Sequence, residues 1–568
     1  MGLRLSQPDE HVKLPCDVLT KLTIRNFKRF TNAEIELGNP VVFIGPNNSG
    51  KTTALQAITL WEVGLRRSKR NGEEGGTINR KDLIAVPIPN ANLLWKDLRV
   101  QDARMEIVVD GVTRDRSWTC GLGFEYANEE SLYCRPLRNT AASPEALATR
   151  VAFLPPMSGL ADREFLKQPA EIDFLIGQGR TAEVLRNLCF RVAHVLEDSE
   201  TKWQALVVRI RQLFGVELDE PESSGDSDGI AMTYREPSGI RLDLSSAGRG
   251  VHQTLLLLAY LSANPNSVVL LDEPDAHLEI LRQRQIYNLL SDAAREQESQ
   301  VVIASHSEVV LNEAAARDVV VAFAGEPHRL NDRPNQLLKA LKDIGFEDYY
   351  QAEQRGWVLY LEGSTDLAIL RAFAAKLQHV ARNELESPFV HYVENQPPRA
   401  RDHFYGLLEA KPDLAGFLPN DRMDRAPQAA GALREAMWER REIENYLCQP
   451  DTLLAWAEAS TEETSPGPLF TPAQAAARRK LMDECTHELV PPLALRNPED
   501  VWWRNVKASD EFLDRLFELF FEKLELPNLM RKTNYHQLAS FVAADRIAPE
   551  VTQKLDLIHE AAQRATPR

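Results

Sequence analysis

Val41-Val-Phe-Ile44 followed by Gly45-Pro-Asn-Asn-Ser-Gly-Lys-Thr52 is the stretch of this sequence that decides the fold. The four apolar residues predict a strand buried on both faces, and the next eight fit the pattern G-x-x-x-x-G-K-S/T in full. Gly45 and Gly50 allow the backbone to curl until its N–H groups point at phosphate oxygens. A helix predicted from about Thr53 to residue 63 adds positive potential at its N-terminus. The stretch therefore predicts an α/β fold with a nucleotide-phosphate site.

Two side chains at the end of this phosphate loop (residues 45–52) have defined chemistry. Lys51 is expected to reach the β- and γ-phosphates of ATP, and the Thr52 hydroxyl is expected to bind Mg²⁺. A chance match in a glycine-rich turn is the alternative, and the flanking strand and helix argue against it. The residues predicted to bind the nucleotide here are Gly45, Asn47, Asn48, Ser49, Gly50, Lys51, Thr52 and Thr53.

A second apolar run, Val268-Val-Leu-Leu-Asp-Glu-Pro274, ends in two acidic residues. It predicts a buried strand with acids at its carboxyl end, where α/β sheets bind ligands. Asp272 is predicted to hold Mg²⁺, directly or through water, and Glu273 to orient and deprotonate the attacking water. Two solvated carboxylates are the alternative, but their combination with the phosphate loop favours a site that hydrolyses ATP.

Two further segments complete the predicted nucleotide site. Val301-Val-Ile-Ala-Ser-His306 is a third buried strand with a polar tip, and His306 is predicted to hydrogen-bond the γ-phosphate. In the signature segment, Leu244-Ser-Ser-Ala-Gly-Arg-Gly250, Ser246 and Gly248 precede an apolar helix and are predicted to bind phosphate. A structural histidine and an ordinary serine N-cap are the alternatives. Strands that alternate with helices predict a largely parallel sheet.

Along the chain the phosphate loop comes first, then the signature segment, the acidic strand and the histidine strand, and in this order the four segments resemble the motifs of ABC-type ATPases. The run Glu273-Pro-Asp-Ala-His-Leu278 is similar to the E-P-E-A-H-L of the AAA-like ATPases found in the overcoming-lysogenisation-defect (OLD) family of nucleases. The resemblance covers residues 18–325. It implies that ATP lies between two ATPase heads, with the signature segment of one protomer completing the site of another. It therefore implies a homodimer or a higher homo-oligomer.

A second candidate site follows the ATPase region. The run Val358-Leu-Tyr-Leu-Glu-Gly-Ser-Thr-Asp366 resembles the first motif of TOPRIM domains. The resemblance implies that Glu362 is a metal ligand or an acid/base group and that Asp366 is a metal ligand. Carboxylates converge in such sites because Mg²⁺ prefers oxygen ligands and nuclease chemistry uses one or two such ions. A capped helix after a strand is the alternative.

The second TOPRIM motif, D-x-D, is incomplete. Aligning its strand with residues 414–421 puts Pro419 where the first aspartate belongs, so Asp421, or Asp421 with Asp424 in a shifted register, remains as a metal ligand for Mg²⁺ or Mn²⁺. Downstream, residues 441–446 resemble a motif of TOPRIM-containing ATPase partners in phage defence. Further groups predicted to join the site are Glu442 or Glu444 as a carboxylate and Lys532, which would stabilise a phosphoryl transition state.

The length of 568 residues predicts two or three domains. We expect an ABC-type P-loop ATPase domain over residues 18–345 with a helical insertion at about 160–215. A smaller α/β TOPRIM-like domain over 355–452 and a mainly helical region over 453–568 would follow. Leu22 to Phe30 predicts one strand near the start of the ATPase domain, and residues from about 83 to 133 alternate as strands do.

Composition narrows the class of protein. No apolar run approaches the roughly 18 residues that span a bilayer, and six scattered cysteines without a CxxC pair suit a reducing compartment. We therefore expect a cytoplasmic protein without membrane contact. The net charge of −17 means that the chain as a whole does not attract nucleic acid. A local basic patch would be needed, and Arg66 to Arg70 is one candidate, with a solvated charged face as the alternative.

Two functions remain open from the sequence. The first is an ATP-regulated, Mg²⁺-dependent endonuclease that cuts DNA or RNA in anti-phage defence, as the family resemblance implies. The second is an ATPase that acts as a sensor or scaffold, with a degenerate TOPRIM-like domain that binds a partner effector protein instead of cutting. The incomplete D-x-D motif at Pro419 motivates the second.

Overall fold

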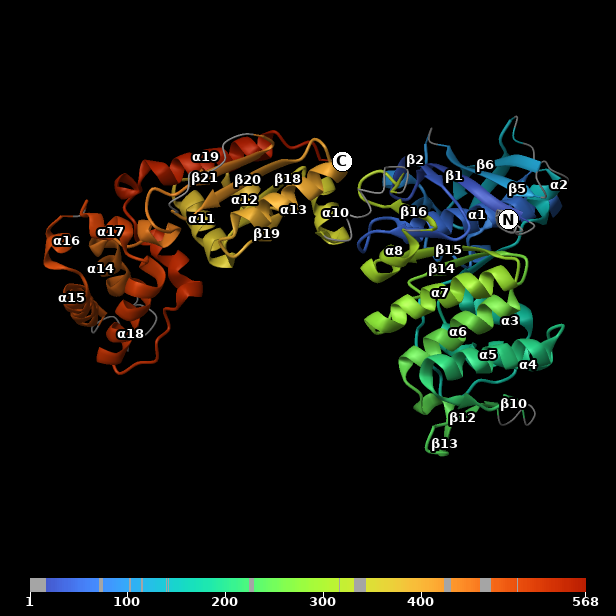
Figure 1. Ribbon diagram of the computed structural model, residues 1–568. Helices are drawn as coiled ribbons and strands as arrows, with labels where there is room; N and C mark the ends of the chain where they lie inside the picture. Colours follow the sequence, from blue (N-terminus) through green and yellow to red (C-terminus); the bar gives the residue numbers. More distant parts are fainter. Residues whose placement is uncertain are drawn as a thin grey trace, which may run out of the picture. The chain divides into compact units, whose positions relative to one another are not determined.

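The computed structural model describes residues 17–70, 75–101, 104–113, 116–138, 140, 143–223, 229–315, 317–330, 344–422, 431–459, 471–497 and 499–567. The chain divides into two compact units, residues 1–338 and 339–568, and each unit is described by itself (Figure 1). None of the helices in these described ranges has both the length and the apolar composition that a membrane crossing requires.

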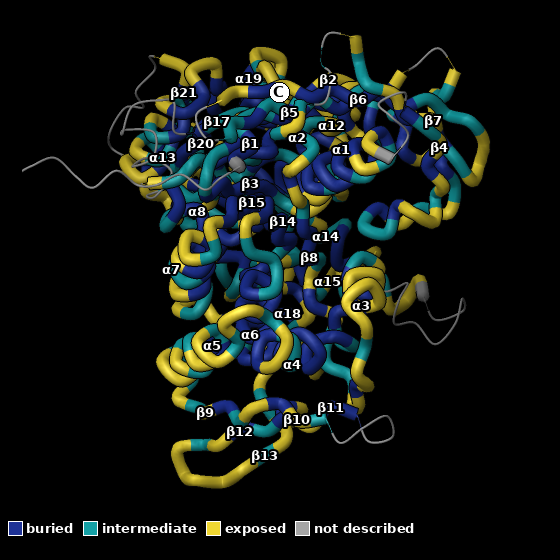
Figure 2. The backbone as a smooth tube through the Cα atoms, turned by 90° about the vertical axis from the view of Figure 1, so that its right-hand side faces the viewer, coloured by how far each residue is buried: buried dark blue, intermediate teal, exposed yellow. Residues whose placement is uncertain are grey.

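The first unit is built on a six-stranded sheet in the order β17-β16-β3-β15-β14-β8, parallel except for β17. Every residue of the three strands predicted from apolar runs, β3, β14 and β15, is buried (Figure 2). The prediction of a largely parallel sheet is confirmed. Its strands are β3 (Val41–Ile44), β8 (Val151–Leu154), β14 (Val268–Asp272), β15 (Gln300–Ser305), β16 (Val319–Ala322) and β17 (His328–Arg329).

A second, antiparallel sheet in the order β2-β1-β5-β6-β7-β4 belongs to the same unit. The single strand expected from Leu22 to Phe30 is wrong, because the chain turns at Lys28, whose φ is 47°, and returns as the next strand. β5 alternates between buried and part-exposed residues, as a strand with one packed face does. The strands are β1 (Asp17–Phe27), β2 (Phe30–Glu36), β4 (Gly76–Asn79), β5 (Met105–Thr113), β6 (Arg116–Asn128) and β7 (Ser131–Pro136).

Helix α1 (Lys51–Arg70) joins the two sheets through one apolar core. It is longer than the predicted helix and continues through the basic residues at its end. Trp61 stacks on Trp118 with ring centroids 6.1 Å apart and donates a hydrogen bond to Cys120 O at 3.0 Å. This packing fixes the helix that follows the phosphate loop. The other helices are α2 (Pro144–Ala148), α3 (Pro169–Gly177), α4 (Leu185–His194), α5 (Ser199–Phe214), α6 (Arg249–Ala263), α7 (Ile280–Glu296) and α8 (Glu308–Ala314).

The second unit contains a four-stranded parallel sheet in the order β19-β18-β20-β21. The next two strands in the chain, β19 and β20, lie on opposite sides of β18, so the strand order reverses there and a crevice is expected where the carboxyl ends of β18 and β20 meet. The strands are β18 (Trp357–Leu361), β19 (Val390–Tyr392), β20 (Ala415–Asn420) and β21 (Leu433–Met437).

Helices cover this sheet and extend from it to the end of the chain. One buried apolar cluster runs from Trp357 in β18 to Ala561 in the last helix, so the sheet and the C-terminal helices share a core. The helices are α10 (Phe346–Arg355), α11 (Ser364–Lys376), α12 (Arg382–Glu386), α13 (Pro397–Ala410), α14 (Pro450–Ala459), α15 (Thr471–Leu489), α16 (Pro492–Arg496), α17 (Val501–Asn505), the π-helix η7 (Ala508–Leu513), α18 (Asp514–Lys523), the 3₁₀ segment η8 (Lys532–Phe541) and α19 (Pro549–Gln563).

A buried ion pair supports this unit and can be tested. Lys411 is fully buried, and its Nζ lies 3.9 Å from Glu353 Oε2 and donates to Thr566 O at 2.9 Å. Lys411→Met would leave the buried Glu353 carboxylate without this positive charge, so urea denaturation should report a loss of about 3–5 kcal/mol in unfolding free energy. The exposed Lys480, 3.8 Å from Glu484, provides the control Lys480→Met, which should change little. Equal losses in both variants would contradict the expectation.

Candidate functional site

The phosphate loop is held in a conformation that depends on its glycines. Gly50 has φ +110°, and a Cβ there would lie 2.7 Å from Arg29 Cδ. A Cβ on Gly45 would lie 2.8 Å from Ser49 Oγ. The Arg29 guanidinium donates to Asn48 O, so the turn between β1 and β2 supports the loop. Sequence reasoning missed this contribution of Arg29, because no local pattern connects it to the loop.

Lys51 lies folded along the loop. Its Nζ donates to Gly45 O at 2.7 Å and to Pro46 O at 2.8 Å. Burial lowers the pKa of Lys51, and the carboxylates of Glu273 and Asp272 oppose this effect. Nearby, the buried Ser49 Oγ has no hydrogen-bond partner among the described residues. An orphaned hydroxyl beside a lysine in a glycine-rich turn fits a phosphate ligand.

The acidic strand meets the phosphate loop directly. Thr52 Oγ1 donates a hydrogen bond to Asp272 Oδ1 at 3.1 Å. Burial raises the pKa of Asp272 to about 6, with Glu273 adding to the rise and Thr52 and Lys51 opposing it. A hydroxyl and a carboxylate at this distance are the pair of oxygen ligands that Mg²⁺ takes in P-loop sites. The structure thus brings together the two residues predicted to hold Mg²⁺.

Glu273 and His306 also come together at the ends of neighbouring strands. Glu273 has φ 49°, a conformation rare outside glycine, and its N–H donates to Ala304 O at 2.8 Å. His306 Nδ1 lies 3.6 Å from Glu273 Oε1, and both side chains are partly exposed. Because β14 and β15 are parallel and in register, the acidic tip and the histidine tip share one edge of the sheet.

Ser246 and Gly248 lie on the surface of the unit, just before helix α6 begins. Gly248 is the N-cap of α6, both residues are exposed, and no hydrogen bond in the described ranges connects them to the phosphate loop. Helix α6 is nevertheless linked to the acidic strand, since Gln253 Nε2 donates to Pro274 O at 3.2 Å. Free N–H groups at an exposed helix start remain available to an anion. Their part in nucleotide binding stays a prediction.

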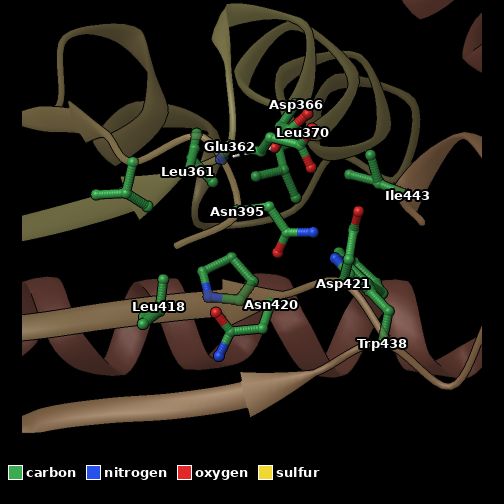
Figure 3. Close-up of a pocket in the computed structure, with 12 residues that line it drawn as sticks. Leu361, Glu362, Asp366, Leu370, Asn395, Leu418, Asn420, Asp421, Trp438 and Ile443 are labelled. Atoms are coloured by element: carbon green, nitrogen blue, oxygen red, sulfur yellow. Dashed lines mark hydrogen bonds between the residues drawn. The ribbon is translucent and has the colours of Figure 1, made fainter. Parts of the chain in front are cut away.

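The second acidic site forms at the crevice between β18 and β20. Glu362 follows β18, Asp366 lies in the first turn of α11, and Asp421 follows β20, and all three line one pocket (Figure 3). Asp366 Oδ2 accepts the Glu362 N–H at 3.0 Å, so this carboxylate also caps the strand-to-helix turn. Asn395 lines the same pocket and was not foreseen, and Asp424 lies outside the described residues.

The carboxylates of this pocket are electrostatically crowded. Burial raises the pKa of Asp421 to about 9, and its proximity to Glu362, Asp366 and Glu442 adds to the rise. Burial also raises the pKa of Asp366 to about 6, with a further contribution from Glu362. Like charges buried together favour the uptake of either protons or a cation. The donor set, which consists of oxygen atoms, suits Mg²⁺ or Mn²⁺.

Glu444 and Lys532, two of the downstream residues suggested by the sequence, lie close to the carboxylates of this pocket. Burial, with Glu442 and Asp366 next in effect, raises the pKa of Glu444 to about 8. Burial disfavours the charge on Lys532, but Glu444, Asp510, Glu442 and Glu362 outweigh it and raise the pKa of the ammonium group. Lys532 therefore stays charged next to the acidic cluster.

Comparison with protein families identifies the ATPase part of the chain. Residues 18–70 match the model described as "AAA ATPase domain", and residues 179–312 match "AAA domain, putative AbiEii toxin, Type IV TA system". The chain contains an ATP-binding domain of the AAA ATPase type. The two matched segments include the phosphate loop, the signature segment and the acidic strand.

Individual relatives either match a short stretch of the chain or share little sequence identity with it. Over 54 residues the chain is 44% identical to the DNA replication and repair protein RecF of Rickettsia felis (strain ATCC VR-1525 / URRWXCal2), a match that spans 9% of this chain and 15% of that protein. The recombination mediator protein RecF with ATP has 13% identity and a TM-score of 0.32, covering 56% of this chain and 100% of that chain. An Smc head domain from Pyrococcus furiosus, bound to the C-terminal domain of ScpA, has 14% identity and a TM-score of 0.36, covering 58% and 99%.

Proposed function

We propose that the first unit hydrolyses ATP and that nucleotide binding regulates a divalent-metal-dependent endonuclease site in the second unit. The observation that carries the ATPase part is the hydrogen bond between Thr52 and Asp272, with Glu273 and His306 beside it. The observation that supports the nuclease part is the convergence of Glu362, Asp366 and Asp421. DNA or RNA would be the substrate, and the resemblance to OLD-family proteins supports a role in anti-phage defence.

In the proposed ATPase reaction each group has one task. The backbone N–H groups of residues 45–52 and the Lys51 ammonium would bind the phosphates, which requires Lys51 to leave the carbonyl groups it now contacts. Mg²⁺, held by Thr52 and Asp272, would neutralise charge on the phosphates when bound. Glu273 would take a proton from the attacking water, and His306 would hydrogen-bond the γ-phosphate.

ATP would also join two copies of the chain. Ser246 and Gly248 are exposed at the start of α6, and within the described ranges no hydrogen bond ties them to the phosphate loop of the same unit. We propose that they complete the nucleotide site of a second protomer in a homodimer or a higher homo-oligomer. The helix dipole and free N–H groups at this helix start suit a phosphate group of ATP held by the other copy.

In the second unit, Glu362, Asp366 and Asp421 would hold Mg²⁺ or Mn²⁺. The crowding of these carboxylates supports the fit, because a divalent cation would relieve the repulsion that now favours their protonated forms. Lys532 would stabilise negative charge on a phosphodiester in the transition state. The residues around the pocket would thus orient a phosphate group of nucleic acid beside the metal ligands.

The ATP site is tested first by Lys51→Ala. Loss of the buried ammonium removes the side chain predicted to contact two phosphates, so ATP affinity and turnover should both fall by at least about 100-fold, equivalent to about 2.7 kcal/mol. Isothermal titration with ATP and a phosphate-release assay measure the two quantities. Undiminished affinity and turnover would refute the proposed site. Lys202→Ala, at a partly exposed lysine on α5, provides the control.

An alternative function is favoured by one observation. Pro419 occupies the position of the first aspartate of the expected D-x-D motif, and the neighbouring Asn420 is buried and uncharged. A site that lacks this carboxylate would bind a partner effector protein while the first unit acts as an ATP-dependent sensor. Incubation of the purified chain with Mg²⁺ or Mn²⁺, ATP and mixed DNA and RNA decides between the two functions, because only the nuclease produces cleavage.

A further inference from the structure

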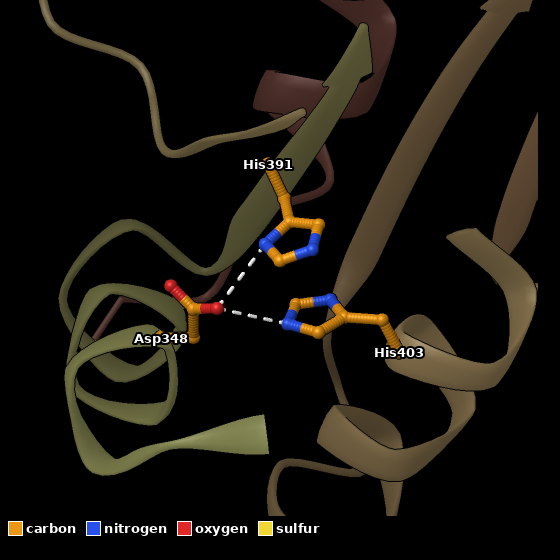
Figure 4. Close-up of side chains that lie close together, drawn as sticks. All are labelled: Asp348, His391 and His403. Carbon is orange, nitrogen blue, oxygen red and sulfur yellow. Dashed lines mark hydrogen bonds and ion pairs between the residues drawn. The ribbon is translucent and has the colours of Figure 1, made fainter. Parts of the chain in front are cut away.

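A cluster of one carboxylate and two imidazoles lies in the second unit, apart from the acidic pocket. Asp348 comes from α10, His391 from β19 and His403 from α13 (Figure 4). Asp348 Oδ2 lies 3.1 Å from His391 Nδ1 and 3.0 Å from His403 Nε2. Three elements that are distant in sequence therefore direct three metal-ligating atoms toward one point. We refer to these residues as the Asp–His–His cluster.

The spacing of these atoms fits a transition-metal ion. Zinc bonds to imidazole nitrogen and carboxylate oxygen are about 2.0–2.2 Å long and tetrahedral, so ligand atoms in such a site are about 3.3 Å apart. The two nitrogen–oxygen distances of the Asp–His–His cluster are close to this value, and all three ligand atoms lie within 4.8 Å of one another. Small side-chain movements would open the space that an ion needs.

A hydrogen bond with a residue outside the cluster orients one of the two imidazoles. Tyr360, fully buried in β18, places its hydroxyl 2.9 Å from His403 Nδ1. In metal sites the second ring nitrogen of a ligating histidine is usually hydrogen-bonded in this way, which fixes the ring orientation and the tautomer. Tyr360 is also paired in register with His391 across the parallel strands β18 and β19. The sheet thus sets the positions of both imidazoles.

The Asp–His–His cluster can be reached from solvent, and its ligand atoms differ from those of the acidic pocket. The side chains of His391 and Asp348 are 32% and 23% exposed, so an ion and a water ligand can reach them from solvent. Two imidazoles and one carboxylate select Zn²⁺ or a similar transition metal, whereas carboxylates alone select Mg²⁺ or Mn²⁺. Three protein ligands leave a fourth, open position.

We propose that Asp348, His391 and His403 bind one divalent transition-metal ion, Zn²⁺ by preference, with water as the fourth ligand. The ion replaces the two hydrogen bonds that Asp348 now accepts. It joins α10 and α13 to β19, on the side of the sheet where Tyr360 points. This inference does not depend on nucleotide binding or on nuclease activity.

Metal binding by the full-length chain tests the proposal without any variant. After treatment with a chelator, the protein is titrated with Zn²⁺ in a large excess of Mg²⁺, which occupies the carboxylate pocket but does not compete for imidazole ligands. One Zn²⁺ per chain should bind, and Co²⁺ in its place should give the strong visible absorption of a four-coordinate site. Absence of both signals means that the cluster is only a hydrogen-bonded network, which overturns the proposal.

Variants then assign the ligands. Asp348→Asn and His403→Gln should each weaken Zn²⁺ binding by more than 100-fold, and Tyr360→Phe by about 10–100-fold as an outer-shell change. His379→Gln is the matched control, since His379 also pairs with an aspartate, Asp556, at 3.1 Å but belongs to no group of three metal-ligating residues in the part of the chain that the structure describes. Unchanged Zn²⁺ affinity in the first two variants, or equal loss in the control, would overturn the assignment. Circular dichroism checks that each variant is folded.

Discussion

Replacing Glu273 with glutamine is expected to reduce ATP turnover by about 10²–10⁴-fold while ATP affinity stays within a few-fold of the parent value. The range is the usual contribution of a general base. The amide keeps the size of the side chain and the φ of 49° at this position, but it cannot accept the proton of the attacking water. Lys51, Thr52 and Asp272 remain in place, so nucleotide binding should persist. Phosphate release and equilibrium binding of ATP measure the two effects.

The same variant tests whether ATP joins two protomers. If the exposed signature segment completes the site of another copy, Glu273→Gln protein should accumulate as a dimer when ATP is present, because hydrolysis no longer separates the heads. Sedimentation velocity with and without ATP measures this change. Glu200→Gln, an exposed carboxylate on α5, should behave like the parent protein. Turnover within threefold of the parent value in Glu273→Gln would remove Glu273 from the mechanism.

The ATP site was predictable from sequence because its residues lie in short motifs next to apolar strands. Residues 41–52 specify strand, turn and helix locally, and residues 268–273 specify a strand with an acidic tip. A parallel sheet brings such tips to one edge, so the meeting of Thr52 with Asp272 follows from topology. The antiparallel sheet was harder to foresee. The turn between its first two strands requires a positive φ at Lys28. The sequence there has neither a glycine nor an asparagine-glycine pair, which are the usual signals of a hairpin turn.

The second unit was only partly predictable, for a related reason. Glu362 and Asp366 belong to one strand-to-helix motif, and Asp421 ends another predicted strand, so these residues could be named in advance. By contrast, Asp348 and His403 are separated by 55 positions, and no spacing rule connects them. They meet because helices α10 and α13 pack on the same sheet. Local sequence patterns carry no information about this tertiary packing.

Replacing Glu362 with glutamine is expected to abolish metal-dependent cleavage of nucleic acid while ATP turnover is retained. A catalytic metal contributes several kcal/mol of charge stabilisation, so loss of a ligand should reduce cleavage on the order of 10³-fold. Asp421→Asn should have a similar effect, since the cation has to displace the proton that burial and Glu362 favour on this carboxyl group. Cleavage of labelled DNA and RNA in Mg²⁺ or Mn²⁺ measures the effect.

The control for these variants is Glu409→Gln, an exposed carboxylate on α13 that should leave cleavage unchanged. Cleavage at the parent rate in Glu362→Gln would exclude the acidic pocket as the nuclease site. If the parent chain hydrolyses ATP but cuts neither DNA nor RNA under any of these conditions, the sensor function is the correct one. In that case Asp421→Asn should stabilise the second unit at neutral pH instead of inactivating it, because folding no longer has to protonate a carboxyl group whose pKa burial and Glu362 raise to about 9.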